Sequence, residues 1–462
     1  MERSIPLGAP RRKSLGSRVW PVLVLLLVLL LLLAWFRVGA PPRVTIEPGM
    51  PAIGPATPVR VVIEEPRRGL GALEIELTQD GEVFPLEAEE FHPRPFWAFW
   101  GPRTPSHTAH LEIGSRSLPK LREGEAVLAV KAHRAPTWLR HPSPEVVTRT
   151  FAVRLRPPRL EVEAAPASVS TGGSGLVVYR VGPEAASDGV RVGSWHFEGY
   201  PLGEESKGMR LALFGVPFDL TESLQIRLEA SDELGNRVEV PFLPHLKVVP
   251  FAQDQIRLDK AFLERVVPPI QAETPDLKPS GDTLKDYLEI NRNLRAANAE
   301  ALRRLAANSA HGFLWQGRFL QLPGSQVMSS FADRRTYLFE GREVDQQDHL
   351  GFDLASTRQA PVPAANGGTV VLARYFGIYG RTVVVDHGYG LMTLYAHLSS
   401  ISVEEGQRVA KGDILGRTGA TGLAGGDHLH FSTLIHGLPV NPLEWWDARW
   451  IERQILDKVN GS

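Results

Sequence analysis

The chain has 462 residues, of which 43% are hydrophobic and 22% are charged, and its formal net charge is -1. This length exceeds what one hydrophobic core usually organises, so the sequence predicts a folded protein of two to four domains. The near-zero charge and the absence of a long basic run argue against nucleic acid as a partner. No cysteine is present, which excludes disulfides, thiolate zinc sites and cysteine nucleophiles.

The first element is an apolar run from Val19 to Phe36, interrupted only by Pro21. A helix of this length crosses most of a hydrocarbon core of roughly 30 Å. Basic residues outnumber the single acid, Glu2, ahead of this run. The positive-inside rule therefore predicts that residues 1–18 form a cytoplasmic basic tail.

Residues 19–40 are accordingly expected to be a single-pass anchor in the cytoplasmic membrane. The bulk of the chain is then extracytoplasmic, in the periplasm. A cleaved signal peptide is the alternative, because Val38 and Ala40 satisfy the small-residue rule at a cleavage site. The length of the apolar run favours the anchor, since it exceeds the roughly 7–15 residues of an ordinary signal-peptide core.

Two stretches after the anchor alternate in the way that is typical of β-strands, as in residues 73–77. We expect a β-sandwich module over residues 41–157 and a second over 158–249, similar to immunoglobulin-like modules in pattern alone. One irregular β-domain is the alternative. Neither stretch holds a catalytic constellation, so both are interpreted as spacers or as docking surfaces for an envelope or division protein. An aromatic cluster in the first would suit sugar rings, but a core or interface patch is the commoner explanation; it comprises Phe96, Trp97, Phe99 and Trp100.

Residues 250–312 change to the apolar spacing of a helix and are expected to form a helical connector. Asp282 or Thr283 is expected to cap the start of its main helix. The connector is more often simply packed against its neighbours, and a lever or lid over the next domain is the alternative.

From Phe313 onward the sequence returns to strands and turns, and three groups of polar residues stand out: His349 with Asp353, His397, and His428 with His430. Residues two apart on a strand share a face, so His428 and His430 should point the same way while Leu429 faces the core. The same alternation sends His397 outward with Thr393 and Tyr395. We therefore expect two neighbouring strands to present three imidazoles to one groove.

A catalytic zinc takes three protein ligands and leaves one position for water. Two histidines and one aspartate meet this need, which leaves two histidines free to act on protons or on a developing oxyanion. Each short motif alone is weak evidence, but together and in this order they are strong.

The arrangement resembles the lysostaphin-like (LytM-type) zinc metalloendopeptidases, whose pattern is H-x-G-x-D, then Y-A-H-L, then H-x-H, then Asn-Pro. The matching residues here are His349-Leu350-Gly351-Phe352-Asp353, Tyr395-Ala396-His397-Leu398, His428-Leu429-His430 and Asn441-Pro442. The resemblance concerns the C-terminal domain only, expected over residues 313–450 and followed by a tail at 451–462. A charged insertion, Asp333 to Asp348, departs from the compact pattern before the first ligand.

The resemblance implies that His349, Asp353 and His430 hold Zn²⁺, while His397 and His428 line the catalytic side. His428 is then the expected general base and His397 the group that stabilises the oxyanion, although the sequence would equally allow the exchanged roles. Two further histidines are expected to occupy turns and not the metal site. His387 is expected to be a turn histidine, with a contact behind the metal ligands as the alternative, and His436 is expected in a hairpin turn.

The length and the strand patterns predict a multidomain, mainly β protein, and the resemblance implies that its C-terminal domain is an antiparallel β-sheet. Its implied activity is zinc-dependent hydrolysis of peptide bonds in peptidoglycan stem peptides or cross-bridges. The alternative is a non-catalytic relative that activates cell-wall amidases or serves as a scaffold in envelope assembly. The intact set of ligand positions favours the enzyme.

Overall fold

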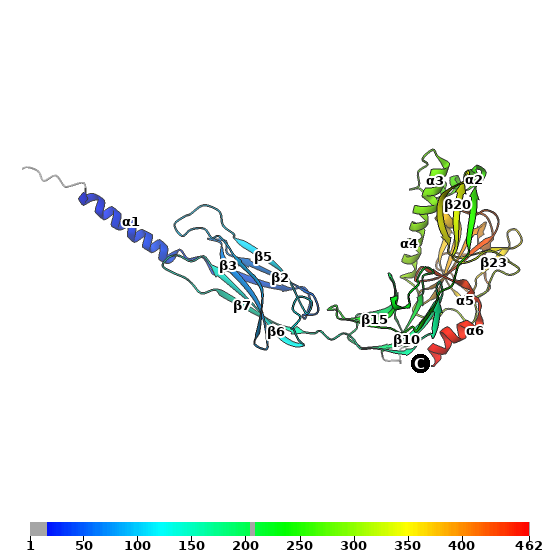
Figure 1. Cartoon of the computed structure of the whole chain (residues 1–462). Helices are drawn as coiled ribbons and strands as arrows, with labels where there is room; N and C mark the ends of the chain where they lie inside the picture. The colour runs from blue at the N-terminus through cyan, green and yellow to red at the C-terminus, as the bar shows by residue number, and fades with distance from the viewer. Residues whose placement is uncertain (1–15, 204–207, 462) are drawn as a thin grey trace, which may run out of the picture. The chain divides into compact units, whose positions relative to one another are not determined.

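The computed structural model describes residues 16–203 and 208–461 (Figure 1). All but the last three residues of the predicted cytoplasmic tail lie outside this range. The chain divides into two compact units, one comprising Met1–Arg156 with Glu233–Asn236 and the other Pro157–Asp232 with Arg237–Ser462.

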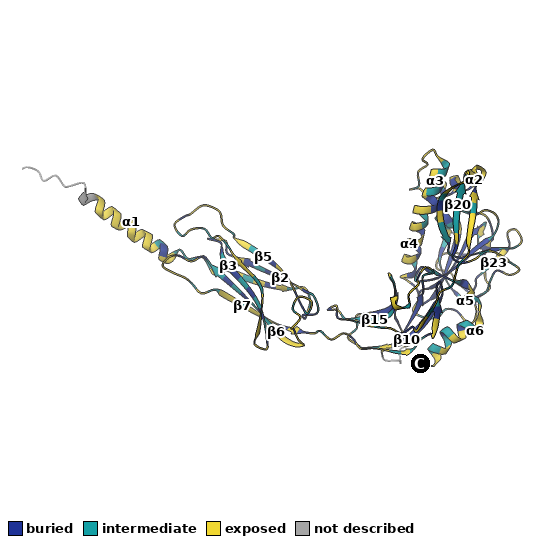
Figure 2. Ribbon diagram, in the orientation of Figure 1, coloured by how far each residue is buried: buried dark blue, intermediate teal, exposed yellow. Residues whose placement is uncertain are grey.

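The first unit begins with helix α1 (Gly16–Phe36). Among the described residues, its segment Val19–Phe36 is the one helical stretch that is long and apolar enough to cross a membrane. The side chains along it are exposed (Figure 2), and Ala34 near its end is buried. The sequence prediction of an apolar helix of this length is confirmed.

Seven strands after α1 form two facing antiparallel sheets, β1-β2-β5 and β4-β3-β6-β7. Their bounds are β1 (Arg43–Pro48), β2 (Thr57–Glu64), β3 (Leu70–Gln79), β4 (Glu82–Glu90), β5 (Ser106–Ile113), β6 (Gly124–Arg134) and β7 (Glu145–Val153). Leu73, Ile75 and Leu77 alternate with half-exposed glutamates and are buried in the core between the sheets. Asp80 and Gly81 both have positive φ and join β3 to β4 as a two-residue hairpin.

The second unit starts with two four-stranded antiparallel sheets, β13-β14-β10-β8 and β12-β11-β15-β16. A short parallel pair, β9 with β17, lies beside them. The bounds are β8 (Leu160–Ala164), β9 (Ser168–Ser170), β10 (Ser174–Val181), β11 (Ser187–Val192), β12 (Trp195–Glu198), β13 (Tyr200–Pro201), β14 (Met209–Gly215), η1 (Ser223–Gln225), β15 (Ile226–Ser231), β16 (Arg237–Val240) and β17 (His245–Lys247).

The stretch predicted as a helical connector holds a strand as well as helices. It comprises β18 (Gln253–Leu258), α2 (Lys260–Ala272), α3 (Thr283–Glu289), the π-helix η2 (Ile290–Leu294) and α4 (Arg295–Ala306). The carboxylate of Asp282 accepts hydrogen bonds from the backbone N–H groups of Leu284 and Lys285, which confirms the predicted cap. Strand β18 pairs in parallel with β20 (Asp333–Phe339) of the next domain.

An antiparallel sheet of eight strands forms the centre of the second unit, in the order β19-β22-β30-β26-β25-β24-β28, with β31 paired to β30. Helix α4 covers one face of this sheet, where Leu302 and Ala306 pack against Leu394 and Leu434. The other face of the sheet belongs to the main core of the unit. The expected mainly β fold with an antiparallel C-terminal domain is confirmed. The bounds are β19 (Gln326–Ser329), β22 (Phe352–Ala355), β24 (Gly368–Tyr375), β25 (Arg381–Gly388), β26 (Leu391–Leu398), β28 (Arg408–Val409), β30 (Leu429–Ile435) and β31 (Leu438–Val440).

The predicted charged insertion forms a hairpin of β20 (Asp333–Phe339) and β21 (Arg342–His349), which joins β18 in a sheet of its own. The remaining elements are β23 (Pro361–Pro363), η3 (Gly377–Tyr379), β27 (Ser400–Ile401), β29 (Ile414–Arg417), α5 (Pro442–Trp446), α6 (Ala448–Ile451), the π-helix η4 (Glu452–Leu456) and α7 (Asp457–Asn460). The predicted tail is thus helical, and Ile451 and Ile455 are buried. The predicted domain boundaries within this unit stay predictions.

Candidate functional site

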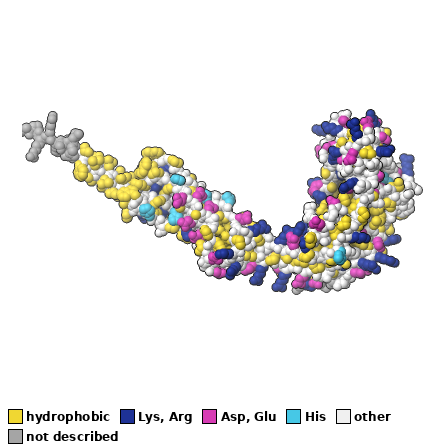
Figure 3. All heavy atoms as spheres, in the orientation of Figure 1, with side chains coloured by type: hydrophobic (Ala, Val, Ile, Leu, Met, Phe, Trp, Pro, Cys, Tyr) yellow, Lys and Arg dark blue, Asp and Glu magenta, His cyan; other side chains and the backbone are white. Residues whose placement is uncertain are grey.

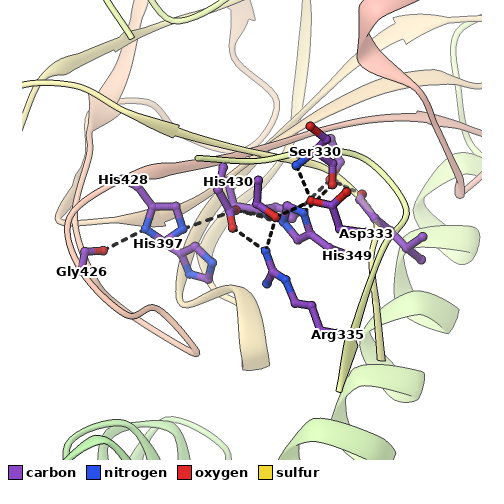
Figure 4. A network of polar contacts seen from close by, with 12 residues as sticks. Ser330, Asp333, Arg335, His349, His397, Gly426, His428 and His430 are labelled. Carbon is purple, nitrogen blue, oxygen red and sulfur yellow. Dashed lines mark hydrogen bonds and ion pairs between the residues drawn. The ribbon is translucent and has the colours of Figure 1, made fainter. Parts of the chain in front are cut away.

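Four neighbouring elements carry the polar residues that the sequence analysis selected. His349 ends β21, Asp353 lies on β22, His430 on β30 and His397 near the end of β26. His428 directly precedes β30 and forms an isolated bridge with Gly419. In the sheet register, Asp353 lies opposite His430. The structure thus brings all five side chains into one cluster, shown close up in Figure 4.

Three ligand-type atoms converge at the centre of this cluster. His349 Nε2 lies 3.0 Å from Asp353 Oδ1 and 3.0 Å from His430 Nδ1, and His430 Nδ1 lies 3.1 Å from Asp353 Oδ1. His349 and His430 are almost completely buried. These three residues are therefore a group that could hold a metal ion.

The outer ring nitrogens fix the tautomer of both histidines. His349 Nδ1 donates to the carbonyl oxygen of Ser330 at 2.9 Å, so in the neutral ring the lone pair is on Nε2. Ser432 donates its hydroxyl proton to Leu350, so its oxygen accepts from His430 Nε2 at 3.0 Å, and His430 Nδ1 is also unprotonated. When both rings are neutral, three lone pairs therefore face one another without a proton between them.

Such an arrangement is electrostatically unfavourable unless a cation lies among the three atoms. Zinc bonds of roughly 2.0–2.2 Å in tetrahedral geometry place neighbouring ligand atoms roughly 3.3–3.6 Å apart. The observed separations are a few tenths of an ångström shorter, within reach of small side-chain adjustments. The donor set of two neutral imidazoles and one carboxylate therefore fits a bound metal ion.

Gly351, between His349 and Asp353, is required by close packing. A Cβ atom at this position would lie 2.6 Å from both His430 Nε2 and Ser432 Oγ. Any larger residue would displace the hydrogen bond that fixes the tautomer of His430. The close approach of His430 and Ser432 thus explains the glycine of the His-Leu-Gly-Phe-Asp motif.

Arg335, on β20, is a member of the site that the sequence analysis missed. Its Nη2 donates to Asp353 Oδ2 at 2.8 Å and to the hydroxyl of Ser329 at 2.8 Å, which leaves Oδ1 of Asp353 turned toward the two histidines. Asp333, Arg335 and Tyr337 share one face of β20. Their spacing of two within the charged insertion was the sequence feature that could have revealed this role.

Burial alone would raise the pKa of Asp353, but the charge and hydrogen bonds of the surrounding histidines outweigh it and hold the pKa well below its ordinary value. Burial lowers the pKa of His430 to about 4. At neutral pH the carboxylate is therefore ionised and the imidazole of His430 is neutral. Both are in the state that a metal ligand requires.

The face predicted for His397 was derived from strand alternation, and this derivation is wrong. Ala396 lies opposite His430 and Tyr395 opposite Phe431, so Tyr395 occupies the core-facing side and alternation would place His397 there too. His397 instead has a φ of 61°, in the left-handed region. This conformation, rare for a non-glycine residue, turns the imidazole to the side of His428 and His430.

His397 and His428 lie beside the convergent trio, with ring centroids 4.9 Å apart. His397 Nδ1 donates to the carbonyl oxygen of Thr421 at 2.8 Å, and His428 Nδ1 donates to that of Gly426 at 2.8 Å. These bonds direct both Nε2 atoms into the site. His428 Nε2 lies 3.4 Å from Asp353 Oδ1.

The two rings differ in their electrostatic surroundings. Burial, together with the neighbouring histidines, lowers the pKa of His397 well below its ordinary value. Burial also acts to lower the pKa of His428, but the hydrogen bond and charge of Asp353 outweigh it, so that this pKa is raised. His428 is the more exposed ring, with 15% of its side chain accessible.

The turn predicted for His387 is wrong, because this residue lies on β25 and is fully buried. Its Nδ1 donates to the carbonyl oxygen of Gly367 at 2.6 Å, and its Nε2 lies 2.7 Å from the hydroxyl of Thr393. Burial lowers its pKa to about 4. Thr393 in turn donates to Tyr395, so His387 belongs to a polar chain on the face opposite the cluster. His436 does lie in the turn between β30 and β31, as predicted.

A cavity of about 440 Å³ opens over the cluster. One wall comes from the stretch predicted as a helical connector, through Phe262, Tyr287 and Arg295. Arg265 on α2 also donates to the carbonyl oxygen of Gly425, next to the residue that fixes His428. The connector therefore borders the site directly.

Comparison with known proteins gives a family for this part of the chain. Residues 347–442, which include all five selected side chains, match the model of Peptidase family M23. The peptidoglycan DD-endopeptidase ShyA of Vibrio cholerae serotype O1 is 37% identical over 119 residues, which cover 26% of this chain and 27% of that protein. The DD-carboxypeptidase/endopeptidase Mpg of Neisseria meningitidis serogroup B is 42% identical over 95 residues, which cover 21% and 22%.

The chain thus matches about a quarter of the length of these curated relatives. A crystal structure of a putative peptidase M23 from Pseudomonas aeruginosa aligns with 60% of this chain and 95% of its own, at 23% identity and a TM-score of 0.37. The sequence-based family assignment is confirmed for the C-terminal domain. The C-terminal part of this chain carries a peptidase M23 (LytM-type) domain.

Proposed function

We propose that this protein is a zinc-dependent endopeptidase that hydrolyses peptide bonds in peptidoglycan stem peptides or cross-bridges. The convergence of three ligand-type atoms from His349, Asp353 and His430 is the observation that carries this proposal. The names of the two curated relatives support the substrate class and the reaction.

In this proposal, His349, Asp353 and His430 hold Zn²⁺. When bound, zinc polarises the scissile carbonyl group and lowers the pKa of water. Arg335 keeps one oxygen of Asp353 turned toward the two histidines. The residues of the chain thereby set both the number and the direction of the ligands.

We assign stabilisation of the developing oxyanion to His428 and acceptance of a proton to His397, which is the exchanged pair of roles that the sequence also allowed. The Nε2 atoms of both face the site because their Nδ1 atoms donate to backbone carbonyl groups. His428 is the more accessible of the two and can reach solvent, whereas His397 is deeply buried. The raised pKa of His428 favours the protonated ring, which can donate from Nε2 to an oxyanion, whereas the lowered pKa of His397 leaves its Nε2 as a proton acceptor.

The proposed location is the cytoplasmic membrane, with α1 as a single-pass anchor and the remaining chain on the extracytoplasmic side. The length and apolar composition of α1 support this location. Peptidoglycan lies outside the cytoplasm, so the location and the substrate are compatible.

The test combines metal analysis with digestion of purified peptidoglycan, read by mass spectrometry. We expect the wild-type chain to hold one zinc ion and to release cleaved peptides. His430→Ala should lose both the metal and the activity, whereas His428→Ala should keep the metal and lose the activity. His110→Ala, a change at an exposed histidine of β5, is the matched control. Equal product release by the wild type and His430→Ala would refute the proposal.

A further inference from the structure

Exposed aromatic side chains gather in two loops of the first unit, residues 91–105 and 135–144, which we call the aromatic loops. Trp97 is 58% exposed, Phe99 63%, Trp100 74% and Trp138 56%. These exposures rule out the core explanation for the aromatic cluster noted in the sequence. Soluble surfaces rarely expose several large aromatic rings together, and such patches mark interaction sites.

Both loops are hydrogen-bonded to the end of helix α1. Arg37 donates to the carbonyl oxygens of Phe96 at 2.7 Å and Ala98 at 2.8 Å. From the other loop, Thr137 donates to the carbonyl oxygen of Ala34 at 2.5 Å. The aromatic loops therefore flank the last turn of α1. Figure 3 shows hydrophobic side chains continuing from the helix onto the adjoining end of this unit.

Two aromatic residues of α1 itself extend the patch. Trp35 and Phe36, at the end of the helix, are 52% and 72% exposed. The guanidinium group of Arg37 lies 3.9 Å from the ring centroid of Phe99, and that of Arg140 lies 5.9 Å from that of Trp35. Helix and loops thus form one continuous aromatic surface.

The loops are held in a shape that keeps the rings outside. Arg94 donates to the carbonyl oxygens of Phe99 at 3.1 Å and Gly101 at 3.2 Å. These bonds satisfy backbone groups within the loop, so its aromatic side chains are free to project outward. The hydrogen bonds of Arg94 thus hold the loop in a conformation that leaves its aromatic rings exposed.

The side chains of the aromatic loops that carry a fixed charge are also all positive. They contain three arginines, Arg94, Arg103 and Arg140, and no Asp or Glu. The far end of the same sandwich, by contrast, carries Asp80 and Glu82 at the turn between β3 and β4. The end next to α1 thus combines exposed rings with these arginines, and the acidic residues Glu90 and Glu145 lie just outside the two loops.

We propose that the aromatic loops dock onto the phospholipid surface of the membrane that α1 spans. Aromatic side chains favour the zone between hydrocarbon and water, where tryptophan gathers at the ends of membrane helices. Arginines beside them can form hydrogen bonds with the phosphate groups of phospholipid headgroups. The inference rests on the proposed membrane span of α1 and extends it, because it fixes the first sandwich on the bilayer surface.

The chain lacks cysteine, so single cysteines can carry a spin label without background. We would place one label in the full-length protein at Val28 in α1, at Trp100 in the aromatic loops, or at Val83 on β4. Val83 is a matched control because it is an exposed apolar residue, at 51%, beside the far turn of the same sandwich. Each protein would be studied in nanodiscs of phosphatidylethanolamine and phosphatidylglycerol.

Electron paramagnetic resonance then reports the accessibility of each label to oxygen, which enters lipid, and to a water-soluble nickel complex. We expect Val28→Cys and Trp100→Cys to be accessible to oxygen and to lose contact with nickel, and Val83→Cys to show the reverse. Nickel contact at Trp100→Cys equal to that at Val83→Cys would overturn the proposal. Nickel contact at Val28→Cys would overturn the membrane span itself, and neither result bears on peptide hydrolysis.

A second measurement separates lipid from sugar as the ligand of the rings. The triple variant Trp97→Ser, Phe99→Ser, Trp100→Ser should unfold at the wild-type temperature, since the rings are exposed. It should nevertheless raise the nickel contact of a label at Leu139→Cys, in the other aromatic loop. If soluble peptidoglycan fragments, and not lipid, protect the label at Trp100→Cys, the patch is a glycan site and the proposal fails.

Discussion

Two clusters of similar residues differ sharply in how the structure holds them. Each of His349-Asp353-His430 in the M23 domain and Glu87-Glu89-His107 in the first sandwich brings three ligand-type atoms within 4.8 Å of one another. The first trio is buried or nearly so, with side-chain exposures of 5–13%. The second lies on an open face, with exposures of 23–46%.

The difference lies in the atoms that face away from the centre. In the M23 trio, the ligand atoms that face away from the centre are fixed by hydrogen bonds with Ser330, Ser432 and Arg335. The remaining ligand atom of each side chain therefore points toward the other two. In the open trio, His107 Nε2 lies 3.1 Å from Glu87 and 3.3 Å from Glu89. A protonated imidazole satisfies this geometry without a metal. Outer contacts, rather than residue type, distinguish a preorganised metal site from a surface ion pair.

The largest expected effect is that of Asp353→Asn. The variant removes the anionic ligand but keeps the shape of the side chain. Loss of an outer contact to a metal ligand typically costs roughly 10–100-fold in metal affinity or activity, and loss of the ligand itself should cost more. We expect zinc content and peptide release to fall together. Glu87→Gln, the matching change in the open trio, should alter neither, and zinc loss from Glu87→Gln would break the comparison.

A buried carboxylate without positive partners should behave in the opposite way to Asp353, and Glu444 on α5 provides this case. It accepts hydrogen bonds from the backbone N–H and the hydroxyl of Ser174, both at 2.8 Å. Burial raises its pKa from 4.5 to about 7, although the bonds from Ser174 act against the rise.

The folded pKa of Glu444 lies above the unfolded one, so the protonated carboxyl group stabilises the fold. This contribution, of about 3 kcal/mol, is complete below about pH 4.5 and is lost as the pH rises through about 7. We expect Glu444→Gln to reduce the decline in unfolding free energy between these pH values, measured by urea denaturation. Glu452→Gln, at an exposed position, should keep the wild-type slope. If Glu444→Gln kept the wild-type slope, the decline in unfolding free energy with pH would not come from this carboxylate.

Arg335→Met tests whether outer contacts are what set the M23 trio apart. The change keeps the apolar stem but frees Asp353 Oδ2, and we expect a loss of roughly 10–100-fold in zinc affinity or activity. Zinc titration and peptide release measure the two quantities. Arg334→Met is the control, because Arg334 pairs with Asp348 on the exposed side of the same strand. Equal effects of the two variants would indicate a general loss of charge.

The sequence was sufficient to predict the mainly β fold and the group of five polar residues. Spacings of two and four residues carry this information, because His428 and His430 are two residues apart and both face the cluster, while Gly351 leaves room for His430 beside His349 and Asp353. Local spacing of this kind can be read directly from the amino-acid sequence. The buried alternation of β3 was predictable for the same reason.

The features that the sequence did not reveal depend on contacts between distant segments or on one unusual backbone angle. Nothing near His397 indicates a positive φ, so alternation gave it the wrong face. His387 resembles a turn residue beside Gly388 but extends a strand that is buried by both of its neighbours. Arg335 reaches Asp353 because its hairpin is anchored in parallel to β18, about 80 residues earlier.

The smallest expected effect concerns the open trio itself. Exposed ion pairs contribute about 0–1 kcal/mol and weaken as salt screens them. His107→Ala should therefore change the unfolding free energy of the first sandwich by no more than about 1 kcal/mol, and the change should shrink at high salt. Denaturation at low and high sodium chloride measures both.

The sharper form of this test adds zinc to Asp353→Asn, in which the M23 site is disabled. A bound ion would stabilise the first sandwich in proportion to its affinity, and the effect would disappear in the double variant with His107→Ala. We expect no zinc-dependent shift in the unfolding of either protein, because the side chains of this trio are exposed to solvent and must be ordered before they can bind an ion. A shift that His107→Ala abolishes would mean that convergence of the right atoms is enough and that burial and fixed outer contacts are not required.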